Sequence, residues 1–567
     1  MTVIFDEVIQ NHNLDDLRKE EEEELVKMLS DKYGLPYIDL RAIAPEPDAL
    51  RTVKEEDARA ANMSPFKLKD NKLFVAVLST QNKKAEEILR GLETRGTEIT
   101  LFLCSHSSLE HVWSRYIDIT AGNKVDGGML NLTGKKLFEM VYNVKTINDL
   151  KDEFEKINNN KTLYRVSRSI ELLVAGALHF NSSDIHIEPE KDKTKLRYRI
   201  DGVLQDIYFF DKDVSHLMNS RLKLLSNLKL SSQATAQDGR FSISLENREI
   251  EVRVSLAPGN YGESFVMRLL DPLNTNVELK GRGMCKILSD VVERALARPN
   301  GLILITGPTG SGKSTTLYGF LKKIFSTEIK IITIEDPIEY HLEGITQTQV
   351  EEEKGYTFLS GLRAALRQDP DVIMVGEIRD TDTAKVAINS ALTGHIVFST
   401  LHTNNAAATI PRLLDLGVNS KVIGSALSLT IAQRLVRTLC SNCKEEHQTD
   451  EKESKLITNI LGTMITSGKK ESLENIVVGN YYNIYKAHAE GCEKCHNGYT
   501  SRMGIFEAIY MTTDLERILS NNPSEREVKD VTAKQGIPLL REDAIIKVIQ
   551  GLTSLEEAGK AVDLFEE

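Results

Sequence analysis

An apolar segment that runs directly into a glycine-rich loop is the feature that most constrains how this chain can fold. Residues 301–306 read GLILIT, residues 307–314 read GPTGSGKS, and a helical pattern follows. The order strand, G-x-x-x-x-G-K-[ST], helix is typical of a phosphate-binding loop, because its glycines let backbone N–H groups curl around phosphate oxygens at a helix N-terminus. The pattern predicts that Lys313 binds the β- and γ-phosphates of a nucleotide and that Ser314 ligates Mg²⁺. The predicted nucleotide-binding residues are Gly307, Pro308, Thr309, Gly310, Ser311, Gly312, Lys313, Ser314 and Thr315.

Further apolar segments follow the loop, and each ends close to an acidic residue or a histidine. They are residues 329–334, 371–375 and 395–400, which precede Glu339, Glu377 and His402 respectively. Apolar runs separated by helical patterns are typical of a parallel sheet covered on both faces. Because open α/β sheets place their sites at the carboxyl ends of the strands, we expect these side chains near the phosphate loop.

Asp380 follows the second of these segments and has a simpler structural interpretation. An acid directly before a helix is typical of an N-cap, so we interpret Asp380 as a cap rather than as a catalytic group. We expect the helix after it to bury an apolar stripe formed by Ala384, Ala387, Ile388, Ala391 and Leu392.

The cysteines predict a metal site outside the phosphate loop. Cys440 and Cys443 form one C-x-x-C pair, and Cys492 and Cys495 form another. Thiolates three residues apart in a tight turn bind one edge of a tetrahedral ion, and a second pair completes a Cys₄ structural zinc site. Redox-active or inert thiols are the alternative, whereas disulfides are disfavoured in a cytosolic enzyme.

The composition bounds the class of protein. The chain has 567 residues, of which 41% are hydrophobic and 27% charged, and 83 acidic against 71 basic side chains give a net charge of −12. These values predict about three or four globular domains and exclude wholesale disorder. An acidic balance with one tryptophan argues against a protein that binds nucleic acid directly. No stretch approaches the roughly 18 apolar residues of a membrane span, so we expect a cytoplasmic protein.

Breaks in these patterns suggest the domain boundaries. The chain opens on a helical pattern that includes Leu25, Met28 and Leu29 and carries an acidic run over residues 20–24, which we interpret as a solvated helix face. The predicted parts are a small mixed domain over 1–120, a linker over 121–160, an α+β domain over 161–275, the parallel-sheet domain over 276–435, a Cys₄ insertion over 436–500 and a C-terminal helical segment over 501–567.

Taken together, these motifs resemble those of the type II secretion and type IV pilus assembly ATPases. The phosphate loop corresponds to that family's Walker A motif, residues 333–340 to its Asp box, residues 366–380 to its Walker B motif and residues 393–403 to its His box. The resemblance continues outside the core, in residues 183–189, 197–202, 237–240, 262–263 and 432–435.

The resemblance implies a RecA-like P-loop ATPase core with a preceding α+β (PAS-like) domain, an N-terminal docking domain and a zinc-binding insertion. The implied cofactors are ATP, Mg²⁺ and Zn²⁺. By similarity, Glu339 orients or deprotonates the attacking water, Glu377 belongs to the Mg²⁺ shell and His402 senses the γ-phosphate, although either glutamate could be the base. Arg253 and Arg268 match a pair of arginines that reach the nucleotide when the two core domains close.

The resemblance also implies the partners. Members of the family form homohexamers that act on an inner-membrane platform protein and an adaptor, so we expect membrane association only through partners, at the cytoplasmic face. The long segment between the cysteine pairs favours pilus assembly, with type II secretion or DNA uptake as alternatives. Two alternatives come from other functional classes: a motor that translocates nucleic acid, and a nucleotide-binding scaffold that does not hydrolyse ATP. Residues 1–120 resemble the docking domain but lack the arginine- and glycine-containing motifs with which some relatives bind a cyclic dinucleotide, so we predict no such site.

Overall fold

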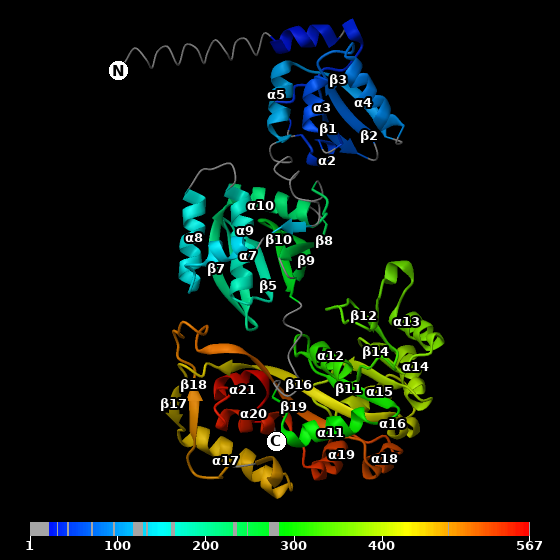
Figure 1. Cartoon of the computed structure of the whole chain (residues 1–567), viewed down its shortest axis with the longest axis vertical. Helices are drawn as coiled ribbons and strands as arrows, with labels where there is room; N and C mark the ends of the chain where they lie inside the picture. The colour runs from blue at the N-terminus through cyan, green and yellow to red at the C-terminus, as the bar shows by residue number, and fades with distance from the viewer. Residues whose placement is uncertain are drawn as a thin grey trace. The chain divides into compact units, whose positions relative to one another are not determined.

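The computed structural model describes residues 22–565 apart from residues 31, 42, 44, 51, 70–71, 95–96, 117–128, 132–133, 160–164, 231–234, 246–247, 272–282 and 474–475. The chain divides into two compact units, Met1–Leu270 and Asp271–Glu567, which are described separately (Figure 1). Within the described residues, no helix is long and apolar enough to cross a membrane.

The first unit begins with a small mixed domain built on a sheet with the order β1-β2-β3. Strand β2 (Lys72–Val77) pairs antiparallel with β1 (Met63–Lys69) and parallel with β3 (Glu98–Leu103), and the crossover between β2 and β3 contains α4 (Lys83–Glu93). These elements confirm the small mixed domain predicted for this region. The remaining named helices of this domain are α2 (Pro47–Leu50), α3 (Glu55–Ala60) and α5 (His106–Ser114).

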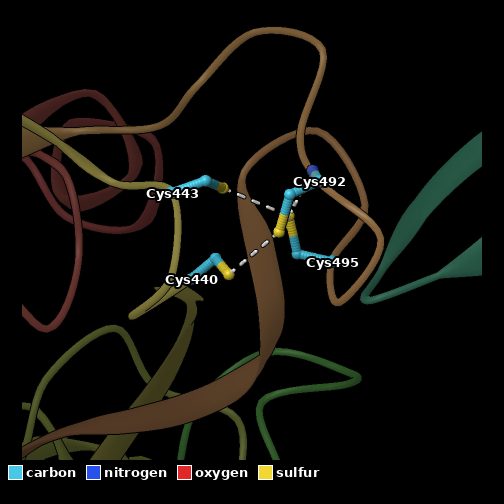
Figure 2. Close-up of side chains that lie close together, drawn as sticks. All are labelled: Cys440, Cys443, Cys492 and Cys495. Atoms are coloured by element: carbon cyan, nitrogen blue, oxygen red, sulfur yellow. Dashed lines mark hydrogen bonds between the residues drawn. The ribbon is translucent and has the colours of Figure 1, made fainter.

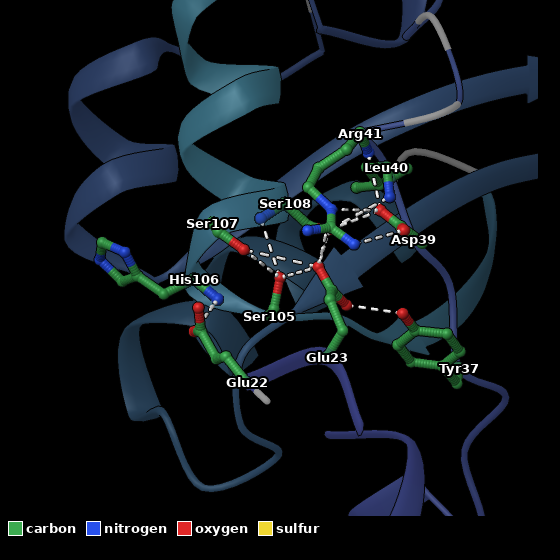
Figure 3. A network of polar contacts seen from close by, with 10 residues as sticks. All are labelled: Glu22, Glu23, Tyr37, Asp39, Leu40, Arg41, Ser105, His106, Ser107 and Ser108. Atoms are coloured by element: carbon green, nitrogen blue, oxygen red, sulfur yellow. Dashed lines mark hydrogen bonds and ion pairs between the residues drawn. The ribbon is translucent and has the colours of Figure 1, made fainter. Parts of the chain in front are cut away.

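The described part of the acidic run, residues 22–24, is only partly solvated, which corrects the prediction for it. Residues 22–30 are helical, and Glu23 is only 6% exposed. Figure 3 shows its carboxylate accepting hydrogen bonds from the Tyr37 hydroxyl at 2.6 Å and from Ser105 and Ser108 of the α5 N-terminus at 2.5 and 3.0 Å. The helix packs inward through Glu23 and Val26, whereas the predicted apolar positions Leu25 and Met28 are exposed, because they lie on its other side.

An α+β domain follows in the same unit, as predicted. Its sheet has the order β4-β8-β9-β10-β5-β6-β7, in which neighbouring strands are antiparallel except for β4 and β8. The strands are β4 (Met129–Asn131), β5 (Asp184–Pro189), β6 (Lys193–Ile200), β7 (Val203–Asp211), β8 (Gln237–Leu245), β9 (Arg248–Gly259) and β10 (Gly262–Leu270). Helices α9 (Arg165–His179) and α10 (Lys212–Leu225) contribute to its apolar core.

The predicted linker over 121–160 is wrong for most of its described residues. Helices α7 (Gly134–Val141) and α8 (Ile147–Asn159) occupy it, and Leu150 and Phe154 of α8 are fully buried in the core of the α+β domain. These two side chains are four residues apart and therefore share one helix face. The surrounding charges obscured that short apolar face in the sequence.

The second unit contains the predicted parallel sheet, with the order β13-β12-β14-β15-β11-β16-β19. All neighbouring strands are parallel except the edge strand β19, which runs antiparallel to β16. The strands are β11 (Gly301–Thr306), β12 (Ile331–Glu335), β13 (Thr346–Gln349), β14 (Val372–Val375), β15 (Ile396–Leu401), β16 (Leu427–Leu439) and β19 (Tyr499–Tyr510).

Both faces of this sheet are buried, because alternate residues of β11 belong to different apolar clusters. Leu302 and Leu304 lie in one cluster and Ile303 and Ile305 in another. Helices α11 (Lys286–Leu296) and α12 (Lys313–Ile324) pack in the second cluster. Helices α13 (Phe358–Ala365), α14 (Thr381–Leu392), α15 (Thr409–Asp415) and α16 (Ser420–Ala426) pack in the first.

Two strands of this sheet cross the predicted boundaries of the C-terminal parts. Strand β16 extends past residue 435, and residues 501–510, predicted as part of a helical segment, belong to β19. Between these strands lie β17 (Glu445–Gln448) and β18 (Asn483–Lys486), which pair antiparallel, and α17 (Glu451–Thr466). Helices α18 (Thr513–Leu519), α19 (Glu525–Thr532), α20 (Leu540–Ile549) and α21 (Leu555–Ala561) follow β19.

Candidate functional site

The phosphate loop joins the inner strand β11, which lies between β15 and β16, to helix α12, as its sequence predicts. Gly307 and Gly312 have φ angles of 148° and 87°, a region that favours glycine. A Cβ atom on Gly307 would lie 2.5 Å from the backbone carbonyl oxygen of Gln433. A Cβ atom on Gly312 would lie 2.7 Å from the side-chain amide nitrogen of Gln433. The loop therefore requires glycine at both positions for conformation and for space.

Lys313 and Ser314 open helix α12 directly after Gly312. The Lys313 ammonium donates hydrogen bonds to the carbonyl oxygens of Gly307 at 2.9 Å and Pro308 at 3.1 Å, so the side chain folds back over the loop. Burial lowers the pKa of Lys313, while the nearby carboxylate of Glu377 opposes that shift. The helix N-terminus, the glycine conformations and the lysine together fit a bound phosphate chain.

Gln433 supports this loop, and the sequence did not predict that contact. It follows Ala432, which pairs with Thr306 across β11 and β16, so it lies level with the start of the loop. Its buried side chain accepts a hydrogen bond from the Thr316 hydroxyl of α12 at 2.8 Å. The parallel pairing of these strands, which sequence alone does not give, creates the contact.

Glu377 and His402, which were predicted to lie near one edge of the sheet, are in contact. The His402 imidazole Nε2 lies 3.1 Å from the carboxylate of Glu377, whose side chain is 15% exposed. The loop that carries His402 is fixed to the end of β11, because the Thr403 N–H donates to the Thr306 hydroxyl at 2.7 Å. Glu339 lies in the segment that follows β12, four residues after its last residue, Glu335.

Arg379 is a further charged residue at this edge, and its pairing was not predicted. Its guanidinium forms an ion pair with Glu377 and lies 3.6 Å from Asp336. Hydrogen bonding to Glu377 raises the pKa of Arg379. The guanidinium also lies over the Phe358 ring, 5.8 Å from its centroid. Arg379 is part of the Walker B segment, but the pattern gave no indication of which carboxylate it contacts.

Asp380 is the helix cap that the sequence predicted. Its carboxylate accepts hydrogen bonds from the backbone N–H and the hydroxyl of Thr383, both at 2.8 Å. The predicted buried stripe of α14 is confirmed except for Leu392, which is 38% exposed because it ends the helix at the margin of the stripe. The residues confirmed as buried are Ala384, Ala387, Ile388 and Ala391.

In the first unit, Arg253 and Arg268 lie directly opposite each other on neighbouring strands β9 and β10. The two arginines belong to a row of residues that lie opposite one another across five strands. Arg240 on β8 is opposite Arg253, Asp184 on β5 is opposite Arg268, and Arg199 on β6 is opposite Asp184. Directly opposite residues share one face of a sheet, so the row gathers four arginines around one carboxylate. Asp184 lies 2.9 Å from the guanidinium Nε of Arg268 and 3.4 Å from that of Arg199. Arg199 and Arg240 were not predicted as site residues, because only the strand register aligns them.

The four predicted zinc ligands lie together in the second unit, where β16 ends and β19 begins (Figure 2). Their sulfur atoms are all within 4.8 Å of one another, and the pairs Cys443–Cys495, Cys492–Cys495 and Cys440–Cys492 are 3.4, 3.6 and 3.8 Å apart. Tetrahedral zinc with bonds of about 2.3 Å separates its sulfur ligands by about 3.8 Å. Backbone hydrogen bonding from Lys494 lowers the pKa of Cys492 to about 6, which favours its thiolate. Burial raises the pKa of Cys443 and of Cys495, an effect that a bound cation would oppose. The cluster is compatible with a structural zinc ion.

The sheet carries a glycine-rich phosphate loop at the end of an inner parallel strand, with a lysine, a glutamate and a histidine at the same edge. This arrangement defines a P-loop ATPase with a RecA-like core. Residues 159–560 match the family described as type II/IV secretion system protein, and residues 33–122 match the MshEN domain. The first match covers more than half of the chain, which therefore belongs to the type II/IV secretion system protein family. The resemblance inferred from the motifs is confirmed.

The relatives of the chain include ATPases of both machines. The type II secretion system ATPase E of Vibrio cholerae is 43% identical over 394 residues, which cover 69% of this chain and 74% of that protein. The type IV pilus assembly ATPase PilB of Pseudomonas aeruginosa is 34% identical over 549 residues, which cover 94% of this chain and 90% of that protein. The same ATPase of Myxococcus xanthus is 34% identical over 543 residues, or 95% of this chain and 90% of that protein. Similarity to the pilus ATPases is thus lower in identity but extends over nearly the whole chain.

Proposed function

We propose that the chain is a motor ATPase that powers type IV pilus assembly through an inner-membrane platform protein. The observation that carries this proposal is the similarity to two pilus assembly ATPases over 94% and 95% of the chain, which includes most of the N-terminal domain. Type II secretion is the second candidate, favoured by the 43% identity to the secretion ATPase over a shorter length. The two candidates differ in partner and share the same phosphate chemistry.

For nucleotide binding, we propose that residues 307–315 surround the phosphate groups of ATP. The Lys313 ammonium would leave the loop carbonyls and contact the β- and γ-phosphates. The Ser314 hydroxyl and the Glu377 carboxylate would hold Mg²⁺, which when bound neutralises charge on the phosphate oxygens. The contact of Glu377 with Arg379 and His402 keeps its carboxylate at the edge where such an ion is needed.

For hydrolysis, we propose Glu339 as the group that orients and deprotonates the attacking water. His402 would sense the γ-phosphate, since its ring already contacts Glu377 at 3.1 Å and is half exposed. Arg253 and Arg268 would neutralise charge that develops on the transferring phosphoryl group, for which a planar guanidinium is well suited. Their neighbours in the arginine row support this assignment, because like charges aligned on one sheet face favour an anionic ligand.

The assembly is proposed by family membership. We propose a homohexamer that reaches the membrane through a platform protein and an adaptor, works at the cytoplasmic face and binds no nucleic acid directly. The Cys₄ cluster would hold zinc as a structural ion. Mass photometry of the purified protein with ATP tests the hexamer, and a single monomeric species under all nucleotide conditions would contradict it.

The catalytic assignment is tested by steady-state ATP hydrolysis of Glu339→Gln, Glu377→Gln and Arg253→Ala beside the wild type. We expect turnover to fall by at least about tenfold in each, because each removes a charge that acts on the transition state. Near-native hydrolysis in all three variants would overturn the assignment.

The choice of machine is tested by recovering membrane partners with the hydrolysis-blocked Glu377→Gln variant in its native host. Recovery of a pilus platform protein supports pilus assembly. Recovery of a secretion platform protein instead would establish the second candidate and contradict the first.

A further inference from the structure

A buried polar cluster connects the helix of the phosphate loop to the segment that carries Glu339. Tyr318 lies on α12, one and a half turns after Lys313, and is 3% exposed. Its hydroxyl donates a hydrogen bond to the carboxylate of Glu335, which ends β12 and is 4% exposed. The same hydroxyl accepts a hydrogen bond from the backbone N–H of Glu339 at 3.3 Å. One oxygen atom therefore contacts both ends of the segment 335–339.

The Glu335 carboxylate is surrounded by hydrogen-bond donors. Besides Tyr318, it accepts from the Thr333 hydroxyl at 2.6 Å and from the side-chain amide of Gln347 at 3.0 Å. Burial raises the pKa of Glu335, and these hydrogen bonds oppose that shift. A buried acid with several donors is costly to disturb, because any partner left behind is desolvated and unpaired.

Gln347 extends the cluster along the same segment. Its amide nitrogen also donates to the carbonyl oxygen of Tyr340 at 2.9 Å, and its amide oxygen accepts from the N–H of Leu342 at 2.6 Å. The Tyr340 ring packs edge to face against Tyr318, with centroids 6.3 Å apart. The backbone around Glu339 is thus held at several points by side chains that meet at Glu335.

We propose that Tyr318 and Glu335 are positioning residues that set the place of Glu339 relative to the phosphate groups. This inference rests on the role proposed above for Glu339. Lys313, to which we assign the phosphates, opens α12, and Tyr318 on the same helix contacts the backbone of Glu339. One helix would therefore fix the distance between the phosphates and the base. Neither Tyr318 nor Glu335 needs to touch the nucleotide. Misplacing a catalytic group by about 1 Å costs on the order of a hundredfold in rate.

The experiment compares Tyr318→Phe with Tyr356→Phe in the full chain. Tyr318→Phe removes only the hydroxyl, and we expect kcat to fall by roughly ten- to a hundredfold with KM for ATP within about twofold of wild type. Tyr356 is the matched control, because its hydroxyl contacts the Thr348 hydroxyl at 2.9 Å on the neighbouring strand β13. It reaches the Glu335 cluster indirectly, through Thr348 and the carbonyl oxygen of Thr333, rather than by contact with Glu335 or Glu339. We expect its kcat to stay near the wild-type value.

A double-variant cycle with Glu339→Gln separates positioning from a general structural effect. If Tyr318 acts through Glu339, Tyr318→Phe should cause no further loss in the residual turnover of Glu339→Gln. Should Tyr318→Phe prove unstable by thermal unfolding, Gln347→Ala on the half-buried edge strand β13 gives the same test, with the same expected loss of kcat.

The outcomes are distinct. Unchanged kcat in both Tyr318→Phe and Gln347→Ala, or an equal fractional loss in the Glu339→Gln background, overturns the inference while the assignment of Glu339 stands. Wild-type turnover of Glu339→Gln instead overturns the proposed base, and the positioning role with it.

Discussion

Two helices of this chain differ in what lies at their N-termini, α5 (His106–Ser114) and α12 (Lys313–Ile324). Helix α5 of the N-terminal domain is capped by Ser105, and carboxylates of the chain itself approach its first turn: Glu22 accepts from the N–H of His106 at 2.8 Å, and Glu23 contacts Ser105 and Ser108 (Figure 3). Helix α12 begins after Gly312, which has no side chain to cap it. The chain supplies its own anions at α5, which stabilises a domain, whereas the first turn of α12 is suited to phosphate.

The largest effect is expected at α12. Replacement of Lys313 by Ala removes the charge that we assign to the β- and γ-phosphates, so ATP turnover should fall by on the order of a thousandfold. The matched control is Lys322→Ala in the last turn of the same helix, which should retain near-native turnover. Steady-state phosphate release measures both. Equal ATP turnover of the two variants would contradict a phosphate-binding role for the N-terminus of α12, and with it the contrast with α5.

The arginine row should show the next effect. Arg268→Ala is expected to lower ATP turnover by roughly a hundredfold, less than Lys313→Ala because Arg253 remains to share the role. The midpoint of thermal unfolding should change little, since the Arg268 side chain is 57% exposed and Arg199 remains 3.4 Å from the buried Asp184 carboxylate. Arg240→Ala, measured in parallel, shows how far along the row the function extends. A loss of stability without a loss of ATP turnover would contradict a catalytic role for the row. It would show that these arginines, like the network at α5, only stabilise their domain.

Metal removal should affect stability more than chemistry. We expect about one zinc per chain by elemental analysis, and a chelator should destabilise the region between β16 and β19 by several kcal/mol. Cys440→Ser should lose the zinc, whereas Cys285→Ser, at the N-cap of α11 and outside the cluster, should retain it. Protein purified without chelator that contains no zinc would contradict the assignment.

The smallest effect is expected from Glu23→Gln, which tests the structural side of the comparison. The amide would place a donor where Glu23 now accepts from Tyr37, Ser105 and Ser108, so the N-terminal domain should lose about 1–3 kcal/mol of stability. Trp113 is the only tryptophan of the chain and is buried in this domain, so its fluorescence during urea unfolding reports on this domain in the full chain. The exposed neighbour Glu24→Gln is the control. A fall in ATP turnover at unchanged stability would contradict a purely structural role for Glu23.

Sequence was informative where a motif ties chemistry to the end of a buried strand. The strand before the phosphate loop and the Asp380 cap could be predicted, because local spacing along the chain determines them. The grouping of the cysteines could be predicted because a tetrahedral zinc site needs both C-x-x-C pairs. Other pairings between distant segments were not revealed by the sequence. The contact of Arg379 with Glu377 depends on tertiary structure, and so does the burial of Glu23 against α5.

The predicted linker failed for a related reason. In α8 only Leu150 and Phe154 are fully buried, and their short apolar face lies among many charged residues, so composition alone suggested a solvated connection. The arginine row is another feature that the sequence alone does not reveal. Arg240 and Arg199 lie in segments that resemble those of the family, but only strand register makes them neighbours of the predicted arginines.

The most direct test of the account is a single-turnover measurement of ATP hydrolysis by Glu339→Gln, with ATP affinity determined on the same protein. The account predicts that the affinity stays within about threefold of wild type while the hydrolysis rate falls by at least about a hundredfold, because the residue acts on the attacking water and not on the bound phosphates. Hydrolysis at the wild-type rate with ATP bound at saturation would contradict it.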